Sequence, residues 1–343
     1  MPPQRFDPGP QNSSAPFDVS VVVPAFNRGK LIGATLESVA AQTMQPREVI
    51  VVDDGSSDDT ARIAESKGAA VIQQANRGIG AARNAGIRAA SGEWIAFLDS
   101  DDLWVPEKLE IQSLAVQLCP DITMIFSDME QFNGNGLVRP SFLGYRTNFS
   151  EVVGQRPSPD VLCCDPGSLA RAFHRGNFIN PSTLIVHRSL LTSAGPVDES
   201  LGALEDREHV LRLLHHATVA VCRQQLVRYR MHNGQFSADD RRMLDGATHV
   251  ARRIFENPDR YPAGSVEVYR SLLPRVYYSL GLVHMDRGAF PEAKRLLRKS
   301  LSKEVRPRAL AALMIAIAGP NAYRVLRRVK RTLRLPGLTE SAR

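Results

Sequence analysis

This sequence has little cysteine and no long apolar run. Its 343 residues include four cysteines, none in a C-x-x-C pair, and the adjacent Cys163 and Cys164 form a poor zinc or disulfide pattern. We therefore expect free thiols and a reducing compartment. The longest apolar candidate, residues 309–318, is shorter than the roughly 18–20 residues that span a bilayer, so we expect no ordinary transmembrane helix.

Two nucleotide-binding loops are also missing. The sequence holds no G-x-x-x-x-G-K-[ST] segment, which excludes a P-loop. No G-x-G-x-x-G follows the first apolar run at 19–24, so dinucleotide binding is not supported. Basic residues occur without a recognition fold or interleaved aromatic residues, and we expect no nucleic acid as partner.

The charge is unevenly distributed. The net charge is +7, but the segment from Ala293 onward holds 14 Lys and Arg against two acids, leaving 29 basic and 34 acidic residues elsewhere. In this tail Val325, Val329 and Leu333 recur at helical spacing among cations. Such a basic amphipathic helix can lie on an anionic membrane surface. A helix packed on the body is the alternative that stays open.

Apolar runs alternate with helical patterns through the first third of the chain, after a leader (1–17) with five prolines that we expect to be disordered. The expected strands are 19–24, 48–52, 69–73 and 93–98, and the expected helices are 31–42, 60–67, 79–90 and 106–118. This alternation predicts a parallel sheet with right-handed crossovers.

The later pattern is looser. We expect loops over 133–166, strands at 183–186, 219–222 and 226–229, a helix at 207–215, and only helices from about 245. Leu280, Gly281, Ala293 and Leu297 lie near the spacing of a tetratricopeptide-like hairpin. One repeat does not make an array, and an ordinary helical hairpin explains the spacing equally well.

Clustered carboxylates follow two of the expected strands. Asp53 and Asp54 end one strand, and Asp99, Asp101 and Asp102 end another. Parallel strands share a direction, so both groups should lie at the carboxyl edge of the sheet, where ligands bind. Carboxylates this close repel each other unless a cation shares them. We predict a magnesium or manganese site facing a diphosphate, since an acidic helix cap explains one Asp but not three.

Two arginines lie between these acidic groups in the sequence. Arg77 and Arg83 are candidates to contact phosphate or nucleobase, because guanidinium offers a rigid fork of donors. A solvated helix face is the alternative for Arg83.

The motifs occur in the order found in family 2 glycosyltransferases. Val19–Asn27 resembles the family's opening strand, Val51–Asp58 its second-strand motif, and Ala82–Asp102 its helix and D-x-D metal motif. The resemblance extends to Ser237. It implies a GT-A fold, an α/β fold with a Rossmann-like, mixed but mainly parallel sheet, over 18–240. A helical C-terminal extension would occupy 245–343.

The resemblance also assigns roles by position. Pro24 and Phe26 would border the nucleobase, Asp54 would accept hydrogen bonds from the base, Asp99 would contact ribose or metal, and Asp101 would ligate Mg²⁺ or Mn²⁺. Arg83 joins this donor-binding set.

A second part of the resemblance supplies the catalytic base. The segment 204–212 resembles the family's Glu-Asp motif, whose Asp, here Asp206, would take the proton of the acceptor hydroxyl. Capping of the following helix is the alternative. His232 lies in a segment that resembles the one closing over the diphosphate, and it could donate to phosphate or approach the metal. Relatives often carry aromatic or apolar residues where this chain has Arg207 and His209, so the resemblance does not define the shape of the acceptor pocket.

These features predict a metal-dependent, inverting transferase that uses a nucleoside-diphosphate sugar, with a UDP-sugar as first choice. The acceptor would be a glycan, polysaccharide or lipid-linked hydroxyl. We expect a cytoplasmic protein, with peripheral attachment to the cytoplasmic membrane face as an option. Gln225–Tyr229 nearly matches the Q-x-x-R-W signature of processive synthases, but Tyr replaces Trp, which favours single transfer. A nucleotidyltransferase and a catalytically dead glycan-binding scaffold are the alternatives.

Overall fold

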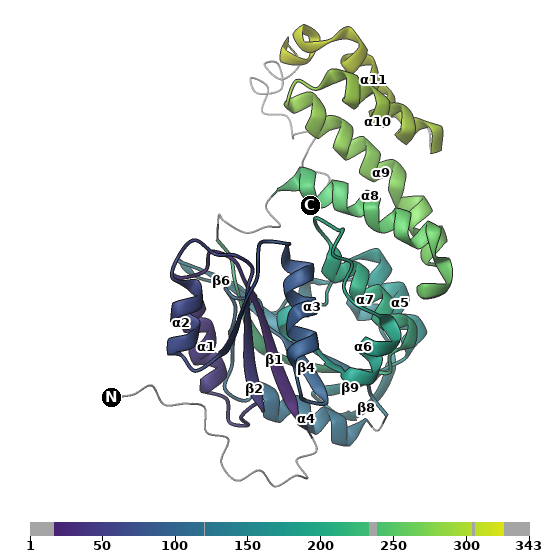
Figure 1. The fold of residues 1–343 in the computed structure, drawn as a ribbon. Coiled ribbons are helices and arrows are strands. Elements are labelled where there is room, and N and C mark those ends of the chain that lie inside the picture. Colours follow the sequence, from purple (N-terminus) through teal and green to yellow (C-terminus); the bar gives the residue numbers. More distant parts are fainter. Residues whose placement is uncertain (1–16, 120, 233–238, 304–305, 326–343) are drawn as a thin grey trace. The chain divides into compact units, whose positions relative to one another are not determined.

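The computed structural model describes residues 17–119, 121–232, 239–303 and 306–325 (Figure 1). The expected leader, apart from Phe17, and the tail with Val329 and Leu333 lie outside these residues. The chain divides into two compact units. The first comprises residues 1–235 together with 259–262, and the second comprises 236–258 together with 263–343.

The first unit is built on one mixed sheet. Its strands are β1 (Val19–Ala25), β2 (Glu48–Asp53), β3 (Ala70–Gln73), β4 (Trp94–Phe97), β5 (Leu103–Trp104), β6 (Met124–Asn133), β7 (Gly136–Arg139), β8 (Gly154–Ser158), β9 (Val161–Cys164), β10 (Ile185–His187) and β11 (Val219–Arg230). Across the sheet they run in the order β3-β2-β1-β4-β10-β6-β11-β9-β8. β5 pairs with β11, and β7 pairs with β6.

The four strands expected from the first third of the sequence pair in parallel, as predicted. β1 has β2 on one flank and β4 on the other, so the strand order changes direction at β1. Such a switch point is where open α/β sheets bind ligands, beyond the carboxyl ends of the strands. β10 lies antiparallel between β4 and β6, and this makes the sheet mixed.

Helices pack on both faces of this sheet (Figure 1). They are α1 (Ile32–Ala40), α2 (Thr60–Ser66), α3 (Ile79–Ala89), α4 (Lys108–Leu118), α5 (Pro166–Arg175), α6 (Arg188–Ala194) and α7 (Glu205–His216), with short 3₁₀ turns η1 (Leu143–Tyr145), η2 (Phe149–Glu151), η3 (Pro181–Thr183) and η5 (Pro258–Arg260). α3 packs on β1 and β2. A Cβ atom on Gly86 would lie 2.3 Å from a methyl of Val22, so this approach of α3 to β1 requires glycine.

The structure corrects two expectations about the middle of the chain. The segment 133–166, expected to form loops, contains β7, β8 and β9, and the two strands expected over 219–229 are one strand, β11, with register shifts between Cys222 and Val227. The buried carboxylate of Asp128 explains part of this order. It accepts hydrogen bonds from the backbone amides of Phe142 and Leu143 and from the side chain of Gln225.

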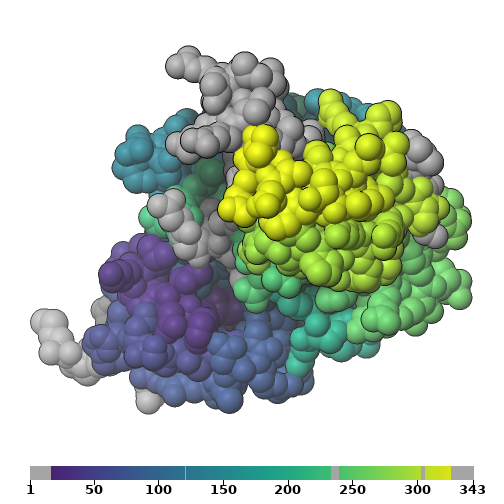
Figure 2. Space-filling view, turned by 90° about the horizontal axis from the view of Figure 1, so that it is seen from above, coloured from purple at the N-terminus to yellow at the C-terminus, as the bar shows by residue number. Residues whose placement is uncertain are grey.

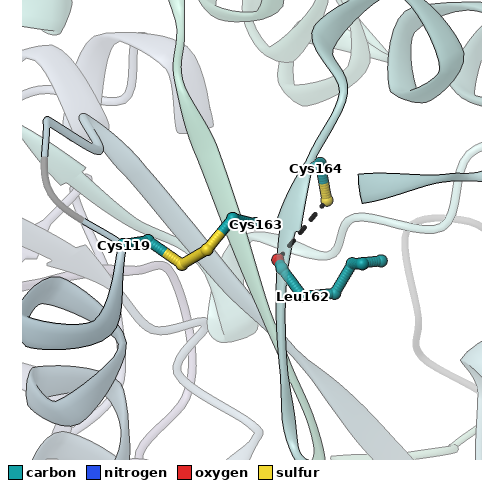
Figure 3. The surroundings of a disulfide bond; sticks show 4 residues. All are labelled: Cys119, Leu162, Cys163 and Cys164. Carbon is teal, nitrogen blue, oxygen red and sulfur yellow. Dashed lines mark hydrogen bonds between the residues drawn. A yellow bond between two sulfur atoms is a disulfide. The ribbon is translucent and has the colours of Figure 1, made fainter. Parts of the chain in front are cut away.

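A disulfide corrects the expectation of four free thiols. Cys119, which follows α4, is bonded to Cys163 in β9, with their Cα atoms 5.9 Å apart (Figure 3). Cys164 and Cys222 are free and buried. The two bonded cysteines are 44 residues apart in the sequence, and only the fold brings them together. Because Cys119 and Cys163 are bonded, they no longer support the prediction of a reducing compartment.

The second unit is helical. Its helices are α8 (Asp240–Glu256), α9 (Ser265–Asp286), α10 (Phe290–Lys303) and α11 (Pro307–Ala318). α9 and α10 form the hairpin expected from the sequence, and a Cβ atom on Gly281 would lie 2.7 Å from Leu297. The surfaces of α10 and α11 lie side by side in yellow-green and yellow in Figure 2. Within the described ranges, no helix combines the length and apolarity that crossing a membrane requires.

Candidate active site

The loops that follow β1 and β2 are bonded to each other at the switch point. Oδ1 of Asn27 accepts from the backbone amide of Ser57 at 2.9 Å, and the amide of Gly29 donates to Oδ2 of Asp58 at 3.0 Å. Asn27 has a φ of 52°, a left-handed conformation that Asn tolerates better than most residues. The interlocked loops leave the ring of Phe26 43% exposed, as a residue bordering a base would be.

Pro24 and Asp54, two of the residues predicted to contact the base, are both buried. Pro24 lies within β1. Asp54 is also buried, and its two carboxylate oxygens accept from the backbone amides of Arg77 and Gly78 at 2.9 and 2.8 Å. Asp54 therefore fixes the loop that leads into α3. Its contact with a base stays a prediction, which the remaining lone pairs of a carboxylate allow.

Arg83 is the most enclosed charge of the site. It extends from α3, its side chain is 5% exposed, and its fork donates to Oε1 of Glu205 at 2.7 Å and to Oδ1 of Asp99 at 3.0 Å. Burial alone would lower the pKa of Arg83, but the charges of Asp99, Glu205 and Asp206 outweigh it and raise that pKa. The alternative of a solvated helix face is wrong.

Asp102 has a structural role in the acidic motif after β4. It is fully buried, and its carboxylate accepts from the hydroxyl of Ser182 at 2.6 Å and from the amide of Arg230 at 3.0 Å. Ser182 in turn accepts from the amide of Asp99 at 3.0 Å. Burial raises the pKa of Asp102 well above its usual value, and the charges of Asp101 and Asp99 raise it further. Asp102 and Ser182 thus fix the turn that presents the other two carboxylates.

Asp101 is partly exposed and lies beside Arg28 and His232. Its side chain is 17% exposed, and its Oδ2 lies 3.0 Å from Nε2 of His232 and 3.6 Å from Nε of Arg28. The structure thus brings His232 to the acidic motif across 131 residues of sequence. Sequence reasoning missed Arg28, although it directly follows the opening-strand motif that ends at Asn27.

The donor set suits a hard divalent cation. Asp99 and Asp101 offer carboxylate oxygens from one turn, which are the ligands that Mg²⁺ and Mn²⁺ favour. Burial raises the pKa of Asp99, Arg83 lowers it, and the charge of Asp101 raises it again. In the part of the chain that the structure describes, no three His, Cys, Asp or Glu side chains are grouped to hold a metal. Two carboxylates would therefore need oxygens of a diphosphate or water to complete the shell.

Asp206 lies in the first turn of α7, close to this cluster. It is half-buried, and its negative charge raises the pKa of both Glu205 and Asp99. The helix begins after Leu204, which is left-handed with a φ of 60° and makes no side-chain cap, so neither acid is the N-cap. Non-glycine residues in this conformation cost about 1–3 kcal/mol and cluster at functional sites. The fold therefore brings Asp206, Asp99 and Arg83 into one electrostatic group.

α7 is held by a buried ion pair. Arg212 donates to both oxygens of Glu208 at 2.7 and 2.8 Å and also to the carbonyl of Pro196 at 2.8 Å. The hydroxyl of Tyr261 donates to Glu208 at 2.6 Å. Burial, and then the charge of Arg212, lower the pKa of His209 to about 3. The position of Asp206 thus depends on the ion pair between Arg212 and Glu208, which holds the same helix in place.

Glu199 is a further site residue that sequence reasoning did not single out. Its carboxylate accepts from Nδ2 of Asn84 at 2.9 Å and from Nη2 of Arg77 at 2.6 Å, which ties α3 to the segment before α7. The signal for Glu199 in the sequence was its charge, a few residues before Asp206. The signal for Glu205 in the sequence was its position directly before Asp206.

Comparisons with known proteins agree with this architecture. Residues 20–171 match the family described as "Glycosyl transferase family 2". A 124-residue alignment is 36% identical to the UDP-Glc:alpha-D-GlcNAc-diphosphoundecaprenol beta-1,3-glucosyltransferase WfgD of Escherichia coli and covers 35% of this chain and 49% of WfgD. The chain thus spans about half the length of that relative.

Solved structures share the fold. The S. aureus TarS fragment 1–349 in complex with UDP-GlcNAc superposes with a TM-score of 0.61 at 23% identity, over 92% of each chain. The mannosyltransferase PcManGT of Pyrobaculum calidifontis, in complex with GDP-Man and Mn²⁺, superposes with a TM-score of 0.52 at 19% identity, over 89% of this chain and 81% of that one. Residues 20–171 therefore match a family 2 glycosyltransferase domain, and the chain shares the GT-A fold of the solved structures.

Proposed function

We propose that this protein transfers a sugar from a nucleoside-diphosphate sugar to an acceptor hydroxyl, with inversion at the anomeric carbon. The observation that carries the proposal is the bridge made by Arg83, which joins the donor-side carboxylate Asp99 to Glu205, the neighbour of Asp206. The bridge connects the two carboxylate groups that such a reaction needs. Structures of the same fold have been solved with UDP-GlcNAc and with GDP-Man, which supports a nucleotide sugar as donor, with a UDP-sugar as first choice.

Asp206 is the proposed general base. A sugar hydroxyl is a weak nucleophile, so a carboxylate must take its proton as it attacks. Asp206 is half-buried in the first turn of α7 and is close enough to Asp99 to perturb its pKa. A base placed opposite the departing diphosphate favours in-line displacement and therefore inversion.

Side chains that can donate to phosphate oxygens would stabilise the leaving group, together with a bound metal. Charge develops on the nucleoside diphosphate as the glycosidic bond breaks, and positive groups fixed beside it lower the barrier. Arg28 and His232 both lie beside Asp101, on the edge where the diphosphate would bind. Asp99 and Asp101 would hold Mg²⁺ or Mn²⁺, which when bound supplies Lewis-acid stabilisation of that charge.

We also propose an acceptor at a membrane surface. The outward face of α11 exposes Leu310, Met314 and Ile317 at 46%, 64% and 56%. Arg306, Arg308 and Arg324 flank this face, and residues 306–325 contain no acid. An exposed apolar stripe with cations around it is typical of helices that lie in an anionic membrane interface. WfgD is named for a lipid-linked acceptor, which supports a glycan or lipid-linked acceptor here, at the cytoplasmic face and in polysaccharide biosynthesis of the cell envelope.

Thermal shift with a panel of nucleotide sugars tests the donor proposal. A ligand that binds only the folded state raises the melting temperature, by an increment that grows with its concentration over Kd. We expect UDP-sugars to raise it, more in the presence of Mn²⁺ than of EDTA. Products separated on an acceptor panel should then have the inverted anomeric configuration. Retention of configuration would exclude Asp206 as the base.

Vesicle sedimentation tests the membrane proposal. We expect the full chain to sediment with vesicles that contain phosphatidylglycerol, to be released by salt, and to stay soluble with phosphatidylcholine alone. Met314→Asp should weaken this binding, whereas Ala318→Asp, an equal change of charge at a small exposed residue of the same helix, should weaken it less. Equal sedimentation of both variants with the wild type would show that α11 does not enter the interface.

A further inference from the structure

Three arginines from separate segments form a cationic cluster in the first unit, which we call the arginine cluster: Arg139, Arg146 and Arg207. Arg139 ends β7, Arg146 follows η1, and Arg207 lies in the first turn of α7, next to Asp206. Burial lowers the pKa of Arg146, and the positive charges of Arg139 and Arg207 lower it further. Arg146 is therefore close enough to each of the other two arginines to be repelled by it.

Two members of the cluster lack the carboxylate partner that many arginines of this unit have. Ion pairs with carboxylates are formed by Arg47, Arg62, Arg77, Arg83, Arg175, Arg212 and Arg228. In contrast, no ion pair with a carboxylate is formed by Arg139 or Arg146 among the described residues. Repulsion between neighbouring cations is costly, and an anion bound between them would relieve it.

Each member is nonetheless held in place. Arg146 lies over the ring of Phe142, 4.4 Å from its centroid, and Phe142 is fixed by Asp128. Arg139 lies 5.0 Å from the ring centroid of Tyr145. Nη1 of Arg139 also donates to Oε1 of Gln131 at 2.5 Å. Stacking on aromatic faces orients a guanidinium and leaves its remaining N–H groups available for a planar or tetrahedral oxyanion.

Arg207 connects the cluster to the end of α5. Its Nη2 donates to the carbonyl of His174 at 3.1 Å, and Asn148 donates to the carbonyls of Ala172 and Gly176 at 2.8 and 2.9 Å. The segment with Arg146 and the helix with Arg207 thus meet at the same helix end. A helix C-terminus favours cations by about 0.3–1 kcal/mol, which accounts for one arginine there but not for three from separate segments.

We propose that the arginine cluster binds a phosphoryl group of the acceptor, carried near the hydroxyl that receives the sugar. The inference rests on the proposed function, because Asp206 as base places that hydroxyl beside the first turn of α7. Arginine forks bind phosphate through two parallel hydrogen bonds, which fix orientation as well as supply affinity. The cluster would then select phosphorylated acceptors over neutral sugars and would hold the hydroxyl toward Asp206.

Phosphorus NMR titration of the full chain with N-acetylglucosamine 1-phosphate tests the proposal. The protein is first saturated with UDP and diamagnetic Mg²⁺, so that the donor phosphates are already in place. We expect saturable binding by the wild type and at least a fivefold weaker affinity in Arg146→Gln and in Arg139→Gln. Arg175→Gln is the matched control, since Arg175 is exposed and paired with Glu151, and it should bind like the wild type.

Three further arms separate the possible sources of the phosphoryl group. Inorganic phosphate should bind more weakly than the sugar phosphate, with the same dependence on Arg146, and neutral N-acetylglucosamine should show no such dependence. Vesicles that contain phosphatidic acid should bind the wild type and Arg146→Gln equally, because the cluster belongs to the acceptor site. If binding to the vesicles depended on Arg146 more strongly than binding to the sugar phosphate, the assignment of the cluster to the acceptor would be overturned.

The outcome is distinguishable from failure of the proposed function. If UDP and Mg²⁺ bind but the sugar phosphate binds all four proteins equally, the arginine cluster is not an acceptor subsite and the transferase proposal stands. If UDP itself does not bind the wild type, the proposed function fails first. Circular dichroism and the UDP affinity of each variant show whether it is folded.

Discussion

Buried and half-buried cations of the first unit are compensated in different ways. Arg83 is enclosed by two carboxylates and keeps its charge despite burial. Arg146 is half-buried among other cations and pairs with no carboxylate among the described residues. Lys108 is fully buried and lies 4.5 Å from the ring centroid of Trp104. The comparison teaches that an internally compensated cation stabilises geometry, whereas an uncompensated one remains available for a ligand or gives up its proton.

Removal of a donor-side carboxylate should have the largest effect. Asp101→Ala is expected to lower transfer by about 10³-fold or more, because a bound metal contributes several kcal/mol of charge stabilisation. The dependence of UDP-sugar affinity on Mn²⁺, measured by calorimetry, should disappear as well. Asp59→Ala, at an exposed ion pair with Arg62, is the control and should change neither quantity. Unchanged Mn²⁺ dependence in Asp101→Ala would show that this residue is not a ligand.

Removal of the proposed base should lower activity nearly as much, but through kcat and not through donor affinity. Asp206→Asn preserves size and is expected to lower kcat by about 10²–10⁴-fold, the usual contribution of general-base catalysis. Donor affinity, measured with the same calorimetric titration, should be close to that of the wild type. Near-normal kcat would move the base to Glu205, whose carboxylate is already bonded to Arg83.

Stability measurements sharpen the contrast between the two arginines. Arg83→Met leaves Asp99 and Glu205 buried without their counterion and should lower the free energy of unfolding by about 3–5 kcal/mol. Arg146→Met removes one stacked cation and relieves repulsion, so its cost should stay within about 1 kcal/mol. Urea denaturation of both variants measures the difference. Similar costs would mean that Arg146 has internal compensation after all.

The third cation predicts a pH dependence. Burial lowers the pKa of Lys108 from 10.5 to about 7. Between those values the unfolded chain binds more protons than the folded one, so stability should rise with pH from about 7 to 10.5. Lys108→Met should remove roughly 1–3 kcal/mol of that rise. Parallel urea titrations at pH 7 and pH 9.5 check this, and identical slopes in both proteins would contradict a neutral buried amine.

How far the sequence predicts this site depends on the distance between partners. Asp99 and Asp101 could be found because the strand before them and the acids themselves are contiguous. The bridge from Arg83 to Glu205 spans 122 residues, and the bond from Ser182 to Asp102 spans 80. No local pattern encodes such pairings. The strands within 133–166 were missed for a related reason, because β7 pairs with β6 and β9 pairs with β11, which lie elsewhere in the sequence.

The short segment 259–262 has a consequence for modularity. It belongs to the first unit, although the chain on both sides of it belongs to the second. It supplies Tyr261 to the ion pair that anchors α7. A gene fragment cut at the first apparent boundary would therefore lack a piece of the first unit. Exchange of the second unit between relatives would preserve the first unit only if these four residues were retained with it.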